Sequence, residues 1–217
     1  MTASQFYEFI VLVAPMLFSF LKDSVVIAAS GTGIYVAFKG LSTWKRQIRG
    51  QSEYALAKEI LINTYKLRDA LIDVRNPLMV SYEGGPLTAE KMAESDALKA
   101  HHNQVSKGYQ SRWEKVTQSK TSLSVNLTES EAMWGGDVKK LAMRLFDLER
   151  FLYSNIRQYL RFIDPEASEK SKELYKAKYS LIHETIYDDL SETDTYNLRL
   201  KESILPLEKY LKKKMSA

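Results

Sequence analysis

The residues of this chain best suited to acid–base or metal chemistry are its three histidines, His101, His102 and His183. His101 and His102 are adjacent, whereas metal-ligand pairs on a helix are usually three or four residues apart. No glutamate lies three positions before any histidine, so the Glu-x-x-His pairs of di-iron bundles are absent. The chain has no cysteine, which excludes thiolate zinc sites, iron–sulfur clusters and a thiol nucleophile. We therefore expect no metal site and no cofactor.

The remaining catalytic motifs are incomplete. His183-Glu184 opens the zinc motif H-E-x-x-H, but position 187 is Tyr. Lys178 precedes His183 at the spacing of the Arg-x4–6-His motif of HEPN-type ribonucleases, and the arginine of that motif is missing. Gly31-Thr32-Gly33 lacks the Lys-Ser/Thr pair of a phosphate loop, and no serine lies in a G-x-S-x-G elbow. The sequence therefore favours a protein without catalytic residues, and an enzyme whose site no motif reveals stays an alternative.

Positive charge is concentrated in two places in this chain, whose net charge is +4. Residues 1–38 have a net charge of −1, and residues 39–49 have a net charge of +4 with no acidic residue. The second basic group is the C-terminal tail, with Lys209, Lys212, Lys213 and Lys214. A protein that binds nucleic acid would spread its basic residues over the folded body. We therefore expect no specific nucleic-acid partner.

Residues 24–44 form an apolar stretch with the length of a membrane span. The stretch has 21 residues, and Lys39 is its only charged residue. As a helix with a rise of 1.5 Å per residue it would be about 31 Å long, close to the thickness of the bilayer hydrocarbon. The sequence therefore predicts a transmembrane helix at residues 24–44, within a membrane anchor at residues 1–44. A buried core helix is the alternative, because Ser, Gly and Thr dilute the hydrophobicity.

The residues at the end of this stretch are those of a membrane interface: Lys39, Trp44, Lys45, Arg46 and Arg49. The Lys39 amine can extend toward the headgroups, and tryptophan is enriched where lipid meets water. Basic residues after a span stay on the cytoplasmic side. We therefore predict a protein of the bacterial inner membrane whose main domain, residues 45–217, is cytoplasmic.

Residues 5–21 form a second apolar segment, with Glu8 and Pro15 inside it. They could be a short first span that makes a hairpin with a turn at residues 22–24, or a helix in the outer interface. The third alternative, a signal-peptide core, lacks a basic start and a convincing cleavage site. The sequence favours one span and an accessory apolar helix.

Small residues recur within the predicted span as Ala29, Gly33 and Ala37. Small side chains four residues apart let a second helix approach closely in lipid, where packing drives association. We predict that they pack against another span or against residues 5–21, and the alternative is that small residues are simply common in spans.

Apolar periodicity predicts helices throughout residues 45–217, because no stretch alternates as a strand does. The predicted helices cover residues 41–75, 89–134, 137–163, 165–187 and 195–214, with a loop at 77–87, an N-cap at Thr88 and a turn at Gly135-Gly136. Mixed propensities predict a break within 121–130, Asp164 an N-cap, and Pro206 a kink. The fold class is therefore all-α, with an elongated antiparallel helical bundle after the anchor.

Two heptad-like seams indicate which faces form the core. The first lies in residues 41–75: Ala57, Ile60, Thr64, Leu67, Leu71 and Val74. The second lies in residues 137–163: Val138, Leu141, Leu145, Leu148, Leu152, Ile156, Tyr159 and Ile163. The second long helix has a weaker pattern: Leu98, Val105, Tyr109, Trp113 and Val116. Tyrosines gather in the last third of the chain, where rings at the bundle boundary are favoured over a binding surface.

The motif after the predicted span is W-K-R-Q-I-R-G, from Trp44 to Gly50, followed by an E-Y-x-x-A-K helix that begins at Glu53. Together with A-M-W-G at residues 132–135, it resembles a group of bacterial membrane-anchored proteins that share a span, W-K/R-R-Q-I/L-K/R-G and E-Y-x-x-A-K. The resemblance covers a minor part of the chain. It implies a span before a helical domain, and it carries no activity.

These observations favour a membrane-tethered helical interaction or scaffold module. Its expected partners are the lipid bilayer and either a protein partner or a second copy in a homo-oligomer, because bundle seams and small-residue stripes suit helix association. The alternative is an oligomeric membrane effector or channel-like protein whose cytoplasmic bundle senses a ligand.

Overall fold

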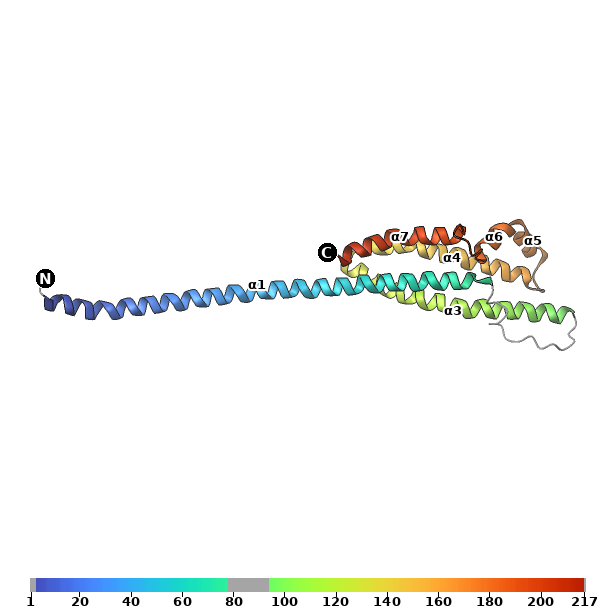
Figure 1. The fold of residues 1–217 in the computed structure, drawn as a ribbon. Helices are drawn as coiled ribbons and strands as arrows, with labels where there is room; N and C mark the ends of the chain where they lie inside the picture. Colours follow the sequence, from blue (N-terminus) through green and yellow to red (C-terminus); the bar gives the residue numbers. More distant parts are fainter. Residues whose placement is uncertain (1–2, 78–93, 217) are drawn as a thin grey trace. The chain divides into compact units, whose positions relative to one another are not determined.

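The computed structural model describes residues 3–77 and 94–216, and within residues 3–34 it describes side chains only at positions 13, 16, 18–20 and 22. All of the regular elements in these ranges are α-helices: α1 (Ala3–Arg75), α3 (Glu94–Trp134), α4 (Asp137–Ile163), α5 (Glu169–Ala177), α6 (Tyr179–Ile186) and α7 (Thr195–Met215) (Figure 1). The all-α prediction is therefore confirmed for the described residues. The Thr88 N-cap and residues 78–87 of the predicted loop lie outside them.

The chain divides into two compact units, unit 1 (Met1–Ser52) and unit 2 (Glu53–Ala217). Helix α1 contributes to both units and passes through residues 22–24, where the hairpin alternative places a turn. The predicted boundary after residue 44 is defined by the membrane and stays a prediction.

Among the helices of the described residues, none is both long enough and apolar enough to cross a bilayer. The transmembrane helix predicted at residues 24–44 is therefore not supported here. The side chains of residues 24–34 lie outside the described set.

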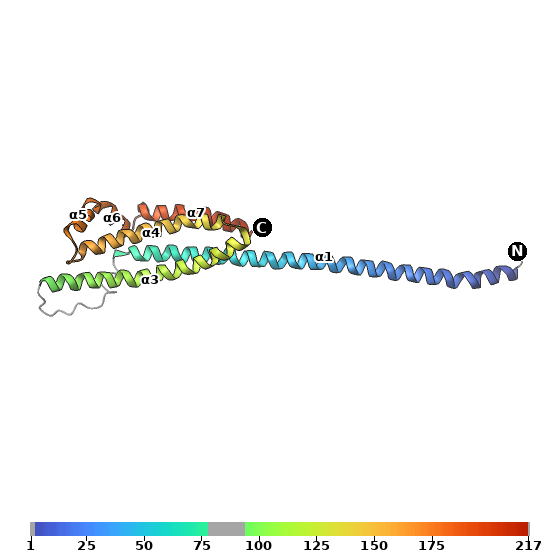
Figure 2. The same cartoon turned by 180° about the vertical axis from the view of Figure 1, so that it is seen from behind.

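Unit 2 is an up-and-down helical bundle. Helix α4 packs against α3 and against α7, and the short helices α5 and α6 also pack on α4. Asn63 of α1 donates a 2.6 Å hydrogen bond to Asn126 of α3, and Arg75 of α1 pairs with Asp194 at the start of α7. The second half of α1, α3, α4 and α7 run in alternating directions, and Figure 2 shows the same arrangement from behind.

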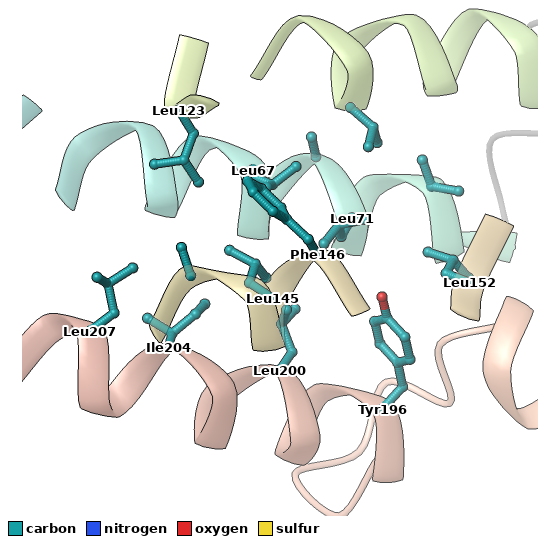
Figure 3. Packing of buried hydrophobic residues seen from close by; sticks show 14 of the residues in the cluster. Leu67, Leu71, Leu123, Leu145, Phe146, Leu152, Tyr196, Leu200, Ile204 and Leu207 are labelled. Atoms are coloured by element: carbon teal, nitrogen blue, oxygen red, sulfur yellow. The ribbon is translucent and has the colours of Figure 1, made fainter. Parts of the chain in front are cut away.

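The seam predicted in α1 forms one wall of the core in unit 2. All six of its residues are at most 1% exposed: Ala57, Ile60, Thr64, Leu67, Leu71 and Val74. The Thr64 hydroxyl donates to the Ile60 carbonyl over 2.7 Å, so its burial leaves no unpaired donor. Figure 3 shows leucines of α1 meeting side chains of α4 and α7 in this core.

Helix α4 has the predicted bounds, and α3 differs from its prediction in two ways. Helix α3 continues through residues 121–130, so the predicted break is wrong. The hydroxyls of Thr121 and Ser122 donate to carbonyls four residues earlier, over 2.9 and 3.1 Å, while Leu123 is fully buried. Local bonding and core burial together outweigh the low helix propensity of this stretch. The second difference is that Leu98 is 54% exposed, outside the core.

The single helix predicted at residues 165–187 is wrong, because the chain forms α5 and α6 with a break at Lys178 (φ −119°). Asp164 does not cap a helix that begins at Pro165. Its carboxylate accepts the Glu166 amide over 2.9 Å in a turn, and Ser168 occupies the N-cap position of α5. In the last helix, α7 continues through Pro206.

Candidate functional site

The five residues predicted at a membrane interface lie on α1 in unit 1, and all of them are exposed: Lys39, Trp44, Lys45, Arg46 and Arg49. Trp44 is 56% exposed. An added Cβ at Gly40 or at Gly50 would meet no atom within 4 Å. The predicted interface is therefore an open helix surface in this unit, with four cations along a single stretch.

Large apolar side chains surround α1 just before this basic stretch. Tyr35, Val36 and Phe38 are 63%, 63% and 70% exposed. With about 3.6 residues per turn, Tyr35 and Phe38 share one face and Val36 lies on another, while the exposed Ala37 completes the apolar run round the helix. The Lys39 amine lies 5.8 Å from the centre of the Tyr35 ring. A helix that is apolar all round is typical of a segment that is buried in protein or in lipid.

From residue 41 the exposed surface of α1 has two distinct faces. Leu41, Trp44 and Ile48 are 45%, 56% and 47% exposed. Their spacing of three and four residues places them on one face, while Lys39 and Arg46 fall on the opposite face. Such an arrangement suits a helix segment that lies where an apolar phase meets water.

The three small residues predicted to pack spans are only partly described. Ala37 is exposed on α1, whereas the side chain of Ala29 and position Gly33 lie outside the described side chains. Their role in helix packing stays a prediction.

A buried ion pair in unit 2 joins the end of α1 to the start of α7. Arg75 is fully buried, and its Nη1 and Nη2 atoms each lie 2.8 Å from one oxygen of Asp194. The other acceptors are Asn197 Oδ1 (2.9 Å) and the carbonyls of Thr185 (2.8 Å), Glu184 (3.0 Å) and Tyr187 (2.8 Å). All five N–H groups of the guanidinium therefore have acceptors, which is the condition for keeping a charge buried.

Asp194 has two roles in this cluster. Besides binding Arg75, it is the N-cap of α7 and accepts the Asn197 amide over 2.7 Å. Burial tends to raise the pKa of Asp194, but the hydrogen bonds from Arg75 and Asn197 outweigh this and hold the pKa below its ordinary value. The carboxylate is therefore ionised at neutral pH and charge-balanced by Arg75.

The carbonyls that end α1 are bound by side chains and backbone of other elements. Arg112 of α3, 2% exposed, donates from Nη1 to the carbonyls of Val74 (3.1 Å) and Asn76 (2.7 Å). The Asp188 amide donates to the Arg75 carbonyl over 2.9 Å. A buried arginine of α3 and a backbone amide thus meet the negative end of the α1 dipole, where cations and hydrogen-bond donors are favoured.

Three carboxylates near this cluster lie close enough to suggest a metal site, since oxygens of Asp188, Asp189 and Asp194 are within 4.8 Å of one another. Both oxygens of Asp194 already bind Arg75. Those of Asp188 accept the Leu190 amide and the Asn197 side chain, over 2.9 and 3.1 Å. The three carboxylates are therefore held by hydrogen bonds within the loop, and the Arg75 guanidinium occupies the position that a metal cation would need.

A cleft of about 680 Å³ opens beside these carboxylates. Its lining consists of Pro77, His183, Glu184, Tyr187, Asp188, Asp189, Asp194 and Thr195. His183 is exposed, and its ring centre lies 4.8 Å from that of Tyr187. The cleft is lined by four carboxylates and contains His183, the histidine that is next to an acid in the sequence.

Aromatic rings fill the same end of unit 2. The ring centre of Tyr159 lies 6.2, 6.2 and 6.1 Å from those of Tyr109, Tyr175 and Tyr187. Burial raises the pKa of Tyr175 to about 12, and raises the pKa of Tyr109 and of Tyr187 well above the ordinary value. These hydroxyls therefore stay neutral and act as hydrogen-bonding groups. Tyr179, whose ring centre lies 5.8 Å from that of Tyr175, is 54% exposed.

Five buried charges went unrecognised in the sequence, namely Arg75, Arg112, Glu149, Asp188 and Asp194. The three on the long helices continue an apolar pattern, since Arg75 follows Leu71 by four positions, Glu149 follows Leu145 by four and Arg112 follows Tyr109 by three. Glu149, 6% exposed, accepts the Lys120 amine over 2.7 Å. A charged residue in phase with a seam predicts a buried pair, and this was the signal that could have found these three.

Comparison with known protein families, with curated proteins and with solved structures finds no match for this chain. The fold therefore defines a structural class only. The described part of the chain is all-α, and its second unit is an up-and-down bundle with a buried arginine cluster. Within the described residues, unit 1 exposes large apolar side chains both far before its basic stretch (Met16, Phe18 and Phe20) and beside it (Tyr35, Phe38 and Trp44).

Proposed function

We propose that the chain is a membrane-tethered helical interaction module. Unit 1 attaches the protein to a bacterial inner membrane, with residues 24–44 crossing the bilayer. The bundle of unit 2 lies on the cytoplasmic side and binds a protein partner or a second copy of the chain.

The observation that carries this proposal is the exposure of four consecutive apolar residues round α1, Tyr35, Val36, Ala37 and Phe38. Water is a poor solvent for such a surface, and an exposed apolar patch usually marks a protein or membrane contact. The basic stretch that follows these residues in the sequence adds a second argument, because cations beside an apolar segment bind anionic headgroups. The resemblance of residues 44–58 to membrane-anchored proteins is consistent with it.

Membrane attachment is tested by fractionating cells that express the full-length chain. We expect the protein in the membrane pellet after washes with high salt and with carbonate, and in solution only with detergent. Val36→Asp should shift a large part of the protein to the soluble fraction, because an aspartate in hydrocarbon costs about 2.5–3.5 kcal/mol. Ile62→Asp is the matched control, since Ile62 is also exposed (41%) but belongs to unit 2.

Recovery of wild-type protein in the soluble fraction without detergent would contradict the proposal. Orientation is tested separately with a reporter fused to the C-terminus. A reporter that functions in the cytoplasm should be active, and one that functions outside the inner membrane should be inactive. The mass of the detergent-solubilised protein distinguishes the two kinds of module. A monomer or dimer supports an interaction module, whereas a ring of several subunits favours a channel-like effector.

A further inference from the structure

Lysines gather at one end of unit 2, from helices that are distant in the sequence. Helix α7 ends with Lys209, Lys212, Lys213 and Lys214, and α4 begins with Lys139 and Lys140 in its first turns. The Lys214 amine lies 5.2 Å from the ring of Trp134, the last residue of α3. The end of α7 therefore meets the turn between α3 and α4, as Figures 1 and 2 show. We refer to these six lysines as the basic end.

The basic end is also the end at which the chain enters unit 2. Helices α1 and α7 run antiparallel, because Arg75 pairs with Asp194 and, further along, Tyr65 shares a hydrogen bond with Glu208. Residues of α7 beyond Glu208 consequently lie toward Glu53, the first residue of the unit. The basic end is therefore the end of unit 2 at which the chain arrives from unit 1.

Some of these lysines are neutralised by neighbours within the unit. Lys212 pairs with Glu208, Lys139 with Glu131 over 2.7 Å, and Lys140 with Asp137 over 3.6 Å. Among the described residues, Lys209 and Lys213 are exposed and form no ion pair with a carboxylate. The surface thus carries positive charge available to an external anion.

The opposite end of unit 2 has the opposite charge. Residues 164–194, which include α5 and α6, carry nine aspartates or glutamates and four lysines. The cleft beside Glu184 and Asp188 lies in this region. A unit that is basic at one end and acidic at the other is oriented by an anionic surface, which attracts the first and repels the second.

We infer that the basic end of unit 2 docks on an anionic lipid surface, through Lys209 and Lys213 with Lys214 beside Trp134. This inference rests on the proposed membrane attachment of unit 1. Lysine favours the headgroup region, because its long stem lets the amine reach anionic headgroups. The consequence is that the acidic cleft faces away from the membrane, toward soluble partners.

The test uses the full-length chain and exploits its lack of native cysteine. A fluorophore is attached to Ser216→Cys, beyond the basic end, or to Glu192→Cys in the acidic region, and the protein is mixed with vesicles that carry an acceptor dye on the headgroups. One vesicle set is phosphatidylcholine alone and the other contains phosphatidylglycerol. We expect energy transfer from position 216 to rise about twofold or more with phosphatidylglycerol, and to fall again in high salt. Transfer from position 192 should not rise.

Charge reversal then identifies the groups responsible. Lys209→Glu with Lys213→Glu should abolish the rise at position 216, because both side chains are exposed and their loss leaves the core intact. Lys176→Glu with Lys178→Glu makes the same change of charge at the opposite end and should leave the rise in place. Circular dichroism confirms that each variant is folded.

The outcomes separate this inference from the proposed attachment. Suppose that the protein floats with both vesicle sets, but that energy transfer from position 216 does not change with phosphatidylglycerol or with the Lys209 and Lys213 substitutions. That result would overturn the docking and leave the membrane attachment supported. Protein that floats only with anionic vesicles overturns the attachment and supports the docking. Protein that floats with neither overturns both.

Discussion

The guanidinium of Arg75 and the carboxylate of Asp194, 119 positions apart in the sequence, form a two-pronged ion pair inside unit 2, with side-chain exposures of 0% and 4%. The pair joins the last residue of α1 to the N-cap of α7. Because the guanidinium also binds carbonyls of α6, three elements are fixed by one side chain. The cluster therefore sets the register of α7 against α1.

Asp194→Ala should lower the free energy of unfolding by about 3–5 kcal/mol, because it leaves the Arg75 charge buried without its counterion. Denaturant unfolding of the full-length protein in detergent, followed by circular dichroism, measures the change. Asp69→Ala removes an aspartate from an exposed pair with Arg68, with exposures of 61% and 39%. That control should cost about 1 kcal/mol or less. Equal losses of unfolding free energy in Asp194→Ala and Asp69→Ala would show that the buried ion pair stabilises the fold no more than an exposed pair does.

The contribution of Asp194 should also depend on pH in a defined direction. Its pKa lies below the ordinary value of 3.8, so the folded state favours the ionised form. The stability that ionisation contributes is complete above 3.8 and is lost as pH falls through the lowered pKa. The difference in unfolding free energy between wild type and Asp194→Asn should therefore be constant near neutrality and shrink in acid. A difference that stays constant, or grows, as pH falls below this value would contradict the assignment.

Much of the fold in unit 2 could be predicted from apolar spacing. The seam from Ala57 to Val74 is buried, and α4 has the expected bounds, since both stretches combine strong periodicity with clear ends. The failures lie where local signals compete with packing. Residues 121–130 have poor helix propensity, yet Leu123 and Leu127 hold them in the core. Propensity differs by less than about 1 kcal/mol per residue, so burial of a leucine decides.

The buried arginine cluster could not be predicted by the same means. Its bonds depend on α6 and α7, which lie more than a hundred positions beyond Arg75. Periodicity indicates that Arg75 faces the core, but it does not identify the partner. The sequence could therefore show that Arg75 is a buried charge, but only the fold shows that Asp194 is its counterion.

The exposure of Leu98 on α3 can be tested against a buried leucine of α4. Leu145→Ala in α4 should lower the unfolding free energy by about 2–5 kcal/mol, because this side chain is 1% exposed and its removal leaves a cavity. Leu98→Ala, in a helix position that the sequence pattern assigned to the core, should change it by about 0.5 kcal/mol or less, since Leu98 is 54% exposed. A large loss at Leu98 would show that this side chain is packed in the core, as periodicity suggested.

Tyr175 links the aromatic cluster to alkaline stability. Burial raises its pKa to about 12 from an ordinary value of 10.0, and the nearby hydroxyls of Tyr159 and Tyr179 add to the shift. The folded state therefore prefers the neutral phenol. Its contribution is complete below 10.0 and is lost as pH rises from there toward 12, because only the unfolded chain ionises readily.

Tyr175→Phe removes this ionisation, so the variant should gain on wild type by about 2 kcal/mol in unfolding free energy between neutral pH and pH 12. The reference is the difference in unfolding free energy between the two proteins at neutral pH, where the phenol and the phenyl ring are both uncharged. That difference contains the cost of losing the hydroxyl. Tyr54→Phe is the matched control, since that ring is 49% exposed on α1. Stability curves of wild type and Tyr175→Phe that stay parallel through the alkaline range would mean that the Tyr175 hydroxyl ionises in the folded state as easily as in the unfolded chain, and that the ring cluster leaves it open to water.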